Sequence, residues 1–191
     1  MATTKPGERK LQILQALAAM LENPKGEKIT TAALAAKIEV SEAALYRHFA
    51  SKAQMFEGLI EFIESSVFGL INQISQQQED GLAQVQAMTL MLLNFAERNP
   101  GMSKVLIGDV LMNEDERLQL RMNQFSDRIE LAFKQALRLA VTQGQIAEAE
   151  VASRATLLSS FIVGRWHRFA KSGFKILPGE QANLHLSLLL R

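Results

Sequence analysis

The sequence predicts an all-α fold, in which an N-terminal three-helix helix-turn-helix domain is joined to a larger C-terminal helical domain. Apolar residues recur at helical spacing in one segment after another, no strand-like alternation is present, and residues 30–52 have the pattern of two short helices joined by a tight turn. A chain of 191 residues with 48% hydrophobic residues and a net charge of +1 can bury a substantial core. We therefore expect a globular protein with a helix-turn-helix domain over residues 1–52 and a helical domain over residues 53–191.

The expected helices are bounded by residues that start or stop helices. Leucines at helical spacing define the first, which an Asn-Pro pair ends before a loop over residues 24–28. Thr30 or Thr31 can cap the second helix and Ser41 the third, because a hydroxyl accepts a hydrogen bond from a first-turn N–H group. In order, the expected helices cover residues 9–22, 32–38, 42–49, 51–77, 82–98, 102–112, 114–141, 147–171 and 181–190.

The C-terminal domain begins with a long helix at Ser51, whose spacing to Gln54 is that of a capping box. Residues 99–101 (NPG) and the Gln143-Gly144 pair end later helices. The two long helices near the C-terminus have wider apolar faces than one small bundle needs. They can bury this surplus across a two-fold axis as the four-helix seam of a homodimer, or inside a single-chain core.

The third expected helix has a chemically distinct outer face. At about 100° per residue, Leu45 and Phe49 fall together and face inward, which leaves Ala43 and Arg47 outside. Small residues allow the backbone to approach a major groove, and Arg47 can offer a bidentate fork to guanine. Tyr46 can reach a phosphate or a thymine methyl group. A surface helical hairpin that carries an arginine explains the same residues, so this pattern alone leaves both interpretations open.

The capping threonines, the run SEAALYRHF and the SK that follows it resemble the N-terminal helix-turn-helix of TetR-type regulators. This resemblance implies that double-stranded DNA is a partner. It implies DNA-backbone contacts from Thr30, Thr31, Tyr46, His48 and Lys52. It also implies that Glu42, Ala43, Ala44 and Arg47 lie toward the bases, with Ser41 at the start of the same helix. A carboxylate such as that of Glu42 can accept a hydrogen bond from cytosine N4.

Composition and motifs argue against other functions. With no cysteine and with His48, His167 and His185 far apart, the sequence predicts no metal site. It has no phosphate-binding glycine loop, nucleophile elbow or HExxH helix, so we expect no catalytic residue, no cofactor and no enzyme activity. No apolar run approaches the ~18 residues of a membrane span, and the N-terminus lacks the apolar core of a signal peptide, so we expect a cytoplasmic protein with no membrane partner.

Charge is divided unevenly along the chain. Residues 1–52 contain eight Lys and Arg against five Glu, whereas the remainder contains thirteen basic against fifteen acidic residues. The basic end is the helix-turn-helix end, although the asymmetry is well short of a strongly basic domain.

Two functions are open for the C-terminal domain once DNA binding is granted. In the first it holds a small-molecule ligand in a cavity that can be lined by Met88, Met91, Met122, Phe125 and Phe161, all of which also suit a plain core. In the second it binds another protein, with DNA as the switch. Trp166 fits a ligand cavity, a dimer seam or the core. Phe62 and Phe68 lie outside the main apolar stripe of their helix, so each packs on a further helix or lines a groove for a partner.

Further segments, MFEGLIEFIESS, LLNFAERNPGMSKVL, DERLQLRMNQFSDRIE and SGFKILPG, are similar to the nucleoid occlusion members of the TetR family. This resemblance implies a nucleoid-associated homodimer that binds palindromic chromosomal sites and, when bound to DNA, blocks assembly of the tubulin-like division protein FtsZ. It implies a partner surface on the helices over residues 51–77 and 82–98, with Phe62, Arg98 and Asn99 as its candidate residues. The alternative is a ligand-responsive TetR-type transcriptional repressor.

Overall fold

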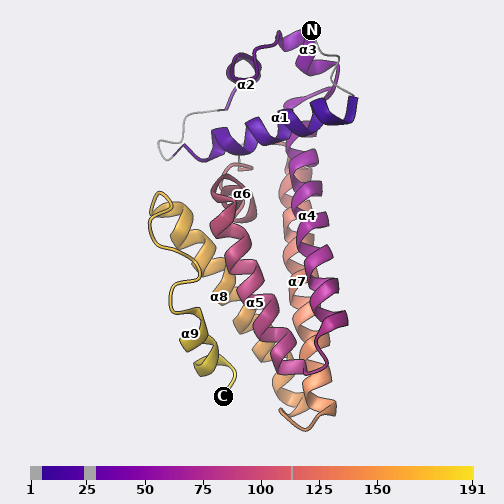
Figure 1. The fold of residues 1–191 in the computed structure, drawn as a ribbon, viewed down its shortest axis with the longest axis vertical. Helices are drawn as coiled ribbons and strands as arrows, with labels where there is room; N and C mark the ends of the chain where they lie inside the picture. The colour runs from indigo at the N-terminus through magenta and orange to yellow at the C-terminus, as the bar shows by residue number, and fades with distance from the viewer. Residues whose placement is uncertain (1–5, 24–28, 113) are drawn as a thin grey trace.

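The computed structural model describes residues 6–23, 29–112 and 114–191, and the loop expected over residues 24–28 lies outside them. The described chain is all-α, as predicted. Its helices are α1 (Pro6–Leu21), α2 (Thr31–Lys37), α3 (Glu42–Tyr46), α4 (Lys52–Gln77), α5 (Gly81–Arg98), α6 (Pro100–Leu106), α7 (Glu116–Thr142), α8 (Val151–Lys171) and α9 (Ala182–Leu189), with a short 3₁₀ turn η1 (Glu148–Glu150) before α8. The long helices α4, α5, α7 and α8 form a bundle, and α1 crosses one end of it with α2 and α3 beyond (Figure 1).

Three hydroxyl caps define the start of the short helices and of α4. The N–H groups of Ala33 and Ala44 donate to the hydroxyls of Thr30 and Ser41 at 3.1 and 3.2 Å. Ser51 accepts a hydrogen bond of 3.2 Å from the N–H of Gln54. The Gln54 side chain in turn accepts one of 2.8 Å from the backbone N–H of Ala50. Because the caps span only a few residues, the sequence predicted them correctly, with Thr30 rather than Thr31 as the first cap. The capping box expected from Ser51 and Gln54 forms only in part, because the Gln54 side chain bonds to the N–H of Ala50 and not to that of Ser51.

Several expected boundaries were wrong. α1 begins at Pro6 rather than residue 9, and α6 begins at Pro100 rather than residue 102, because proline has no N–H to lose at the first position of a helix. α6 ends at Leu106, before Gly108, whose φ of 76° lies in the left-handed region that glycine adopts without strain. α3 ends at Tyr46 rather than residue 49. Its last turn tightens there, since the N–H of His48 donates to the Leu45 carbonyl at 3.0 Å.

One hydrophobic core runs from α1 and α2 through α4 to α9. Trp166 is 2% exposed and its Nε1–H donates to the Leu92 carbonyl at 3.1 Å, which confirms its core role. Of the residues considered as a cavity lining, Met88, Met122 and Phe125 are buried in this core. Met91 and Phe161 pack against it, partly buried. The space that a ligand would need between these helices is therefore filled by their own side chains.

The N-terminal helices are held closely against the C-terminal bundle. A Cβ added to Gly101 in α6 would lie 2.0 Å from the Ala18 carbonyl oxygen of α1, so only glycine allows this approach. Beside it, Lys104 Nζ donates to the Asn23 carbonyl oxygen at 2.8 Å, a favourable place for a cation after a helix C-terminus. Movement of α6 is thereby coupled to movement of α1.

Candidate nucleic-acid interface

α2 and α3 present the predicted DNA-binding residues at the end of the molecule away from α9 (Figure 1). Leu34, Ala35 and Leu45 are buried and hold the two helices against the core. The turn between the helices includes Glu39, whose φ of 55° makes the chain reverse sharply. The exposed candidate residues at this end are Thr30, Ser41, Glu42, Ala43, Tyr46 and Arg47. The half-buried ones are Thr31, Ala44, His48 and Lys52.

A hydrogen-bonded chain joins three of these residues across α2 and α3. The Thr31 hydroxyl donates to Glu42 Oε2 at 2.6 Å, and the Tyr46 hydroxyl donates to Thr31 Oγ1 at 3.4 Å. The sequence placed all three in the interface, but it gave no sign of this contact, because Thr31 and Glu42 are eleven positions apart.

Lys52, the expected backbone contact at the start of α4, has a partner within the protein. Its Nζ forms an ion pair with the Glu114 carboxylate and lies 5.6 Å from the centroid of the Phe56 ring. The side chains of Lys52 and Glu114 are 24% and 17% exposed. Glu114 precedes α7 in the connection from α6, so this pair joins the DNA-binding end to the C-terminal domain.

Two further ion pairs continue along α4 and α7. Glu57 pairs with Arg117 at 2.9 Å, and Glu64 with Arg121 at 2.7 Å. The hydrogen bond to Glu64 is the largest cause that raises the pKa of Arg121 above its ordinary value. The order of the pairs shows that α4 and α7 run in the same direction. Sequence reasoning missed these partners, since pairs about 60 residues apart leave no local signal.

Phe62 and Phe68 of α4 have different surroundings. Phe68 packs edge-to-face on Phe125, with ring centroids 5.4 Å apart, and Arg128 lies 3.7 Å from its ring centroid. Phe62 is 42% exposed. α4 and α5 are antiparallel neighbours joined by a short turn, so Phe62 lies level with the C-terminal part of α5, where Arg98 is exposed.

Asn99, the third candidate partner residue, has a structural role in the fold. It is both the C-cap residue of α5 and the N-cap residue of α6, and its Nδ2 donates to the Phe95 carbonyl at 2.7 Å. A substitution of Asn99 would therefore disturb the junction of α5 and α6 as well as any partner contact.

Comparison with known proteins gives the family of this architecture. Residues 15–59 match the model described as bacterial regulatory proteins of the tetR family, and residues 79–191 match the SlmA-like model of the tetracyclin repressor-like C-terminal domain. The nucleoid occlusion factor SlmA of Aliivibrio fischeri (strain ATCC 700601 / ES114) is 48% identical over 191 residues, which cover 99% of this chain and 97% of the relative. The nucleoid occlusion factor SlmA of Idiomarina loihiensis is 50% identical over 173 residues, which cover 90% of this chain and 88% of the relative. The chain belongs to the SlmA-type nucleoid occlusion factors of the TetR family.

Solved structures agree with this family at the level of the fold. A TetR transcription regulator from Haloarcula marismortui superposes with a TM-score of 0.81 over 96% of this chain and 97% of that one, at 17% sequence identity. PfmR, a TetR-family regulator from Thermus thermophilus, superposes with a TM-score of 0.74 over 94% of this chain and 97% of that one, at 23% sequence identity. As a member of the TetR family, the chain is a DNA-binding regulator and not an enzyme, as the sequence predicted.

The outer face of α8 in this SlmA-type chain carries apolar and small residues among polar ones. Leu157 and Val163 are exposed, and a Cβ added to Gly164 would meet no atom within 4 Å. Beside them lies a shallow hollow of about 510 Å³, to which Ile107, Ser159 and His167 also contribute. The sequence assigned the surplus apolar surface of this helix to a dimer seam or a single-chain core. Leu157 and Gly164 lie outside that core, whereas Phe161 packs against it, partly buried.

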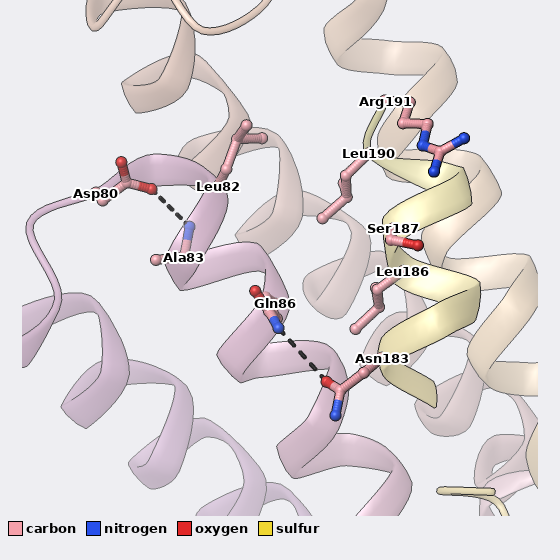
Figure 2. A pocket seen from close by; sticks show the side chains of 9 residues that line it. All are labelled: Asp80, Leu82, Ala83, Gln86, Asn183, Leu186, Ser187, Leu190 and Arg191. Carbon is pink, nitrogen blue, oxygen red and sulfur yellow. Dashed lines mark hydrogen bonds between the residues drawn. The ribbon is translucent and has the colours of Figure 1, made fainter. Parts of the chain in front are cut away.

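A second hollow of about 360 Å³ lies between the start of α5 and α9 (Figure 2). Leucines form its apolar part, and the polar groups around it bond to each other: Gln86 donates to Asn183 at 3.4 Å, and Asp80 accepts from the Ala83 N–H at 2.7 Å. Its full lining is Asp80, Leu82, Ala83, Gln86, Asn183, Leu186, Ser187, Leu190 and Arg191. The amide and carboxylate groups that are already paired offer a ligand few points of recognition, whereas the Arg191 side chain forms no hydrogen bond or ion pair with the described residues.

Two further observations apply to the residues that the structure describes. Among them, no three His, Cys, Asp or Glu side chains come together as a possible metal site. None of the helices in the described ranges is long and apolar enough to cross a membrane.

Proposed function

We propose that this protein is a cytoplasmic, nucleoid-associated homodimer that binds palindromic chromosomal sites and, when bound to DNA, inhibits FtsZ assembly over the nucleoid. The observation that carries the proposal is near-full-length similarity to proteins named nucleoid occlusion factors, combined with an exposed α3 face suited to a major groove. Arg47 is the expected guanine reader, and Lys52 and His48 are expected on phosphates.

The homodimer follows from the apolar outer face of α8. Burying Leu157 and Val163 against the same face of a second copy gives an interface that contacts itself across a two-fold axis. Such a dimer would hold its two recognition helices about one DNA turn apart, ~34–36 Å, and so read a palindrome. A monomeric protein in light scattering at micromolar concentration would overturn this part of the proposal.

The FtsZ contact is assigned to the surface that contains Phe62 and Arg98. An exposed aromatic side chain on α4 and an exposed cation at the level of its end on α5 can together bind a peptide, through apolar contact and through a carboxylate of the peptide. Phe62 lies on α4, which leads from the DNA-binding end, and Arg98 is the last residue of α5, which runs back toward that end.

The test is sedimentation of purified FtsZ polymers with GTP and this protein, with and without a DNA fragment that the protein selects from a random pool. Loss of pelletable polymer that requires the DNA fragment is the expected result. No effect on FtsZ with DNA binding intact would favour the ligand-responsive repressor, whose ligand would then have to bind outside the filled core.

A further inference from the structure

Thr31 and Glu42 are the first residues of α2 and α3, and their side chains meet between the two helices. The Thr31 hydroxyl donates to Glu42 Oε2 at 2.6 Å, a short hydrogen bond to a charged acceptor. The Tyr46 hydroxyl donates to Thr31 Oγ1 at 3.4 Å, so the single hydroxyl of Thr31 both accepts and donates. Within residues 6–23, 29–112 and 114–191, Thr31 is the only side chain that bonds to the Glu42 carboxylate.

This arrangement fixes a flexible acidic side chain before DNA arrives. A free glutamate loses side-chain freedom when it is held in one position, and a hydrogen bond made in advance reduces that loss on binding. Glu42 lies at the start of the second helix of the helix-turn-helix, the part of this motif that contacts base edges. Its oriented carboxylate therefore enters the groove in a defined position.

A carboxylate in a major groove discriminates by attraction and by repulsion. It accepts from the N4 amino group of cytosine, whereas guanine O6 and N7 and thymine O4 are themselves acceptors and repel it. Adenine offers a donor, but its N7 acceptor lies beside it. An acidic side chain also repels phosphates, so it adds no affinity for DNA of arbitrary sequence.

We propose that Thr31 is a positioning residue that orients Glu42 for base readout, and that the two residues together select a C·G pair at one position of each half-site. The proposal rests on the DNA-binding function proposed above. It gives Thr31 a different role from the backbone contact that the family resemblance implies.

The test is selection of binding sites from a random DNA pool, followed by affinity measurements on the selected site and on a random fragment. Glu42→Gln gains an amide donor that suits adenine N6 and N7, so its preference should move from C toward A at one position, with a loss on the order of tenfold on the original site. Thr31→Val should weaken the preference at the same position several-fold and leave affinity for the random fragment unchanged.

Three more variants complete the experiment. Thr31→Ser keeps the hydroxyl and should behave as the wild type. Glu42→Asp keeps the charge but is too short for the Thr31 contact, so it should reproduce the loss of preference without altering α2 and remains informative if Thr31→Val fails to fold. Thr142→Val, an exposed threonine at the far end of α7, is the matched control and should change nothing.

Two results would overturn the proposal. Equal losses on selected and random DNA for Thr31→Val would make Thr31 a backbone contact, and an unchanged base preference for Glu42→Gln would remove Glu42 from readout. A wild-type protein that selects no sequence at all would instead overturn the DNA-binding function on which the proposal rests.

Discussion

Lys52 at the start of α4 pairs with Glu114 in the connection between α6 and α7, sixty-two positions away. The cation that the family resemblance assigns to a DNA phosphate is thus paired with a carboxylate of its own chain. A phosphate and the Glu114 carboxylate can both pair with the Lys52 ammonium group, but Glu114 also repels a phosphate placed beside it. The pair is a direct contact between the start of α4 and the connection that leads to α7.

Glu114→Gln is expected to tighten binding to every DNA sequence. The substitution removes the internal partner of Lys52. In the wild type, giving up this ion pair to bind DNA costs about 0.5–1 kcal/mol, so the variant should bind DNA a few-fold more tightly. The measurement is the dissociation constant for selected and random DNA across a salt series. Arg117→Gln, which removes the neighbouring ion pair with Glu57, is the matched control and should leave both constants unchanged.

Lys52→Ala is the complementary variant. It should weaken binding to selected and random DNA alike and reduce the slope of log affinity against log salt by about 0.9, the effect of one lost phosphate contact. If neither Glu114→Gln nor Lys52→Ala alters DNA binding, and Lys52→Ala only lowers the free energy of unfolding, then the pair joins the two domains and has no part in DNA binding.

Arg47→Ala is expected to cost about 1–3 kcal/mol on the selected site and to relax preference at one base pair, because a bidentate guanidinium–guanine contact is lost. Arg47 is exposed at the end of α3, so the fold should be unaffected. Competition binding with every single-base variant of the site gives the preference. Arg138→Ala, exposed on α7, controls for loss of one positive charge. Equal losses on specific and random DNA would make Arg47 a phosphate contact.

Local contacts account for what the sequence predicted. The caps at Thr30, Ser41 and Ser51 bridge residues three positions apart, and the helical spacing of apolar residues identified every long helix. The family signature needed only the short run around Arg47. The division of the chain at residues 52 and 53, and the roles of the individual DNA-binding residues, stay predictions.

Contacts between distant segments account for what the sequence missed. The partners of Lys52 and Glu64 lie 62 and 57 positions away, and no periodicity within one helix indicates which residue of another helix will meet it. The same reason hid the bond between Thr31 and Glu42. The start of α6 was missed for a local reason. The proline at position 100 was interpreted as part of a signal that ends a helix, but it is the first residue of the next helix.

Gly101→Ala is expected to destabilise the fold. The new Cβ would overlap the Ala18 carbonyl oxygen, a backbone atom of α1 that cannot turn aside, so α1 and α6 must separate. Overpacking of this kind costs about 1–3 kcal/mol, measured as the free energy of unfolding in a denaturant titration. Gly69→Ala in α4 is the matched control: its Cβ meets nothing within 4 Å, and the change should stabilise the helix by up to about 1 kcal/mol. A Gly101→Ala protein as stable as the wild type would show that α1 is not held against α6.

Phe62→Ala is expected to leave DNA affinity unchanged and to abolish the DNA-dependent effect on FtsZ polymers. Phe62 is 42% exposed, so its removal leaves no cavity and should lower the free energy of unfolding by less than about 1 kcal/mol. The measurement is FtsZ sedimentation with the selected DNA fragment, beside the affinity for that fragment. Leu70→Ala, a second exposed apolar residue of α4 at 39%, is the matched control and should inhibit FtsZ as the wild type does. If Phe62→Ala unfolds the protein, Phe62 belongs to the core, and if Leu70→Ala loses the effect equally, the partner surface follows α4 toward its C-terminus.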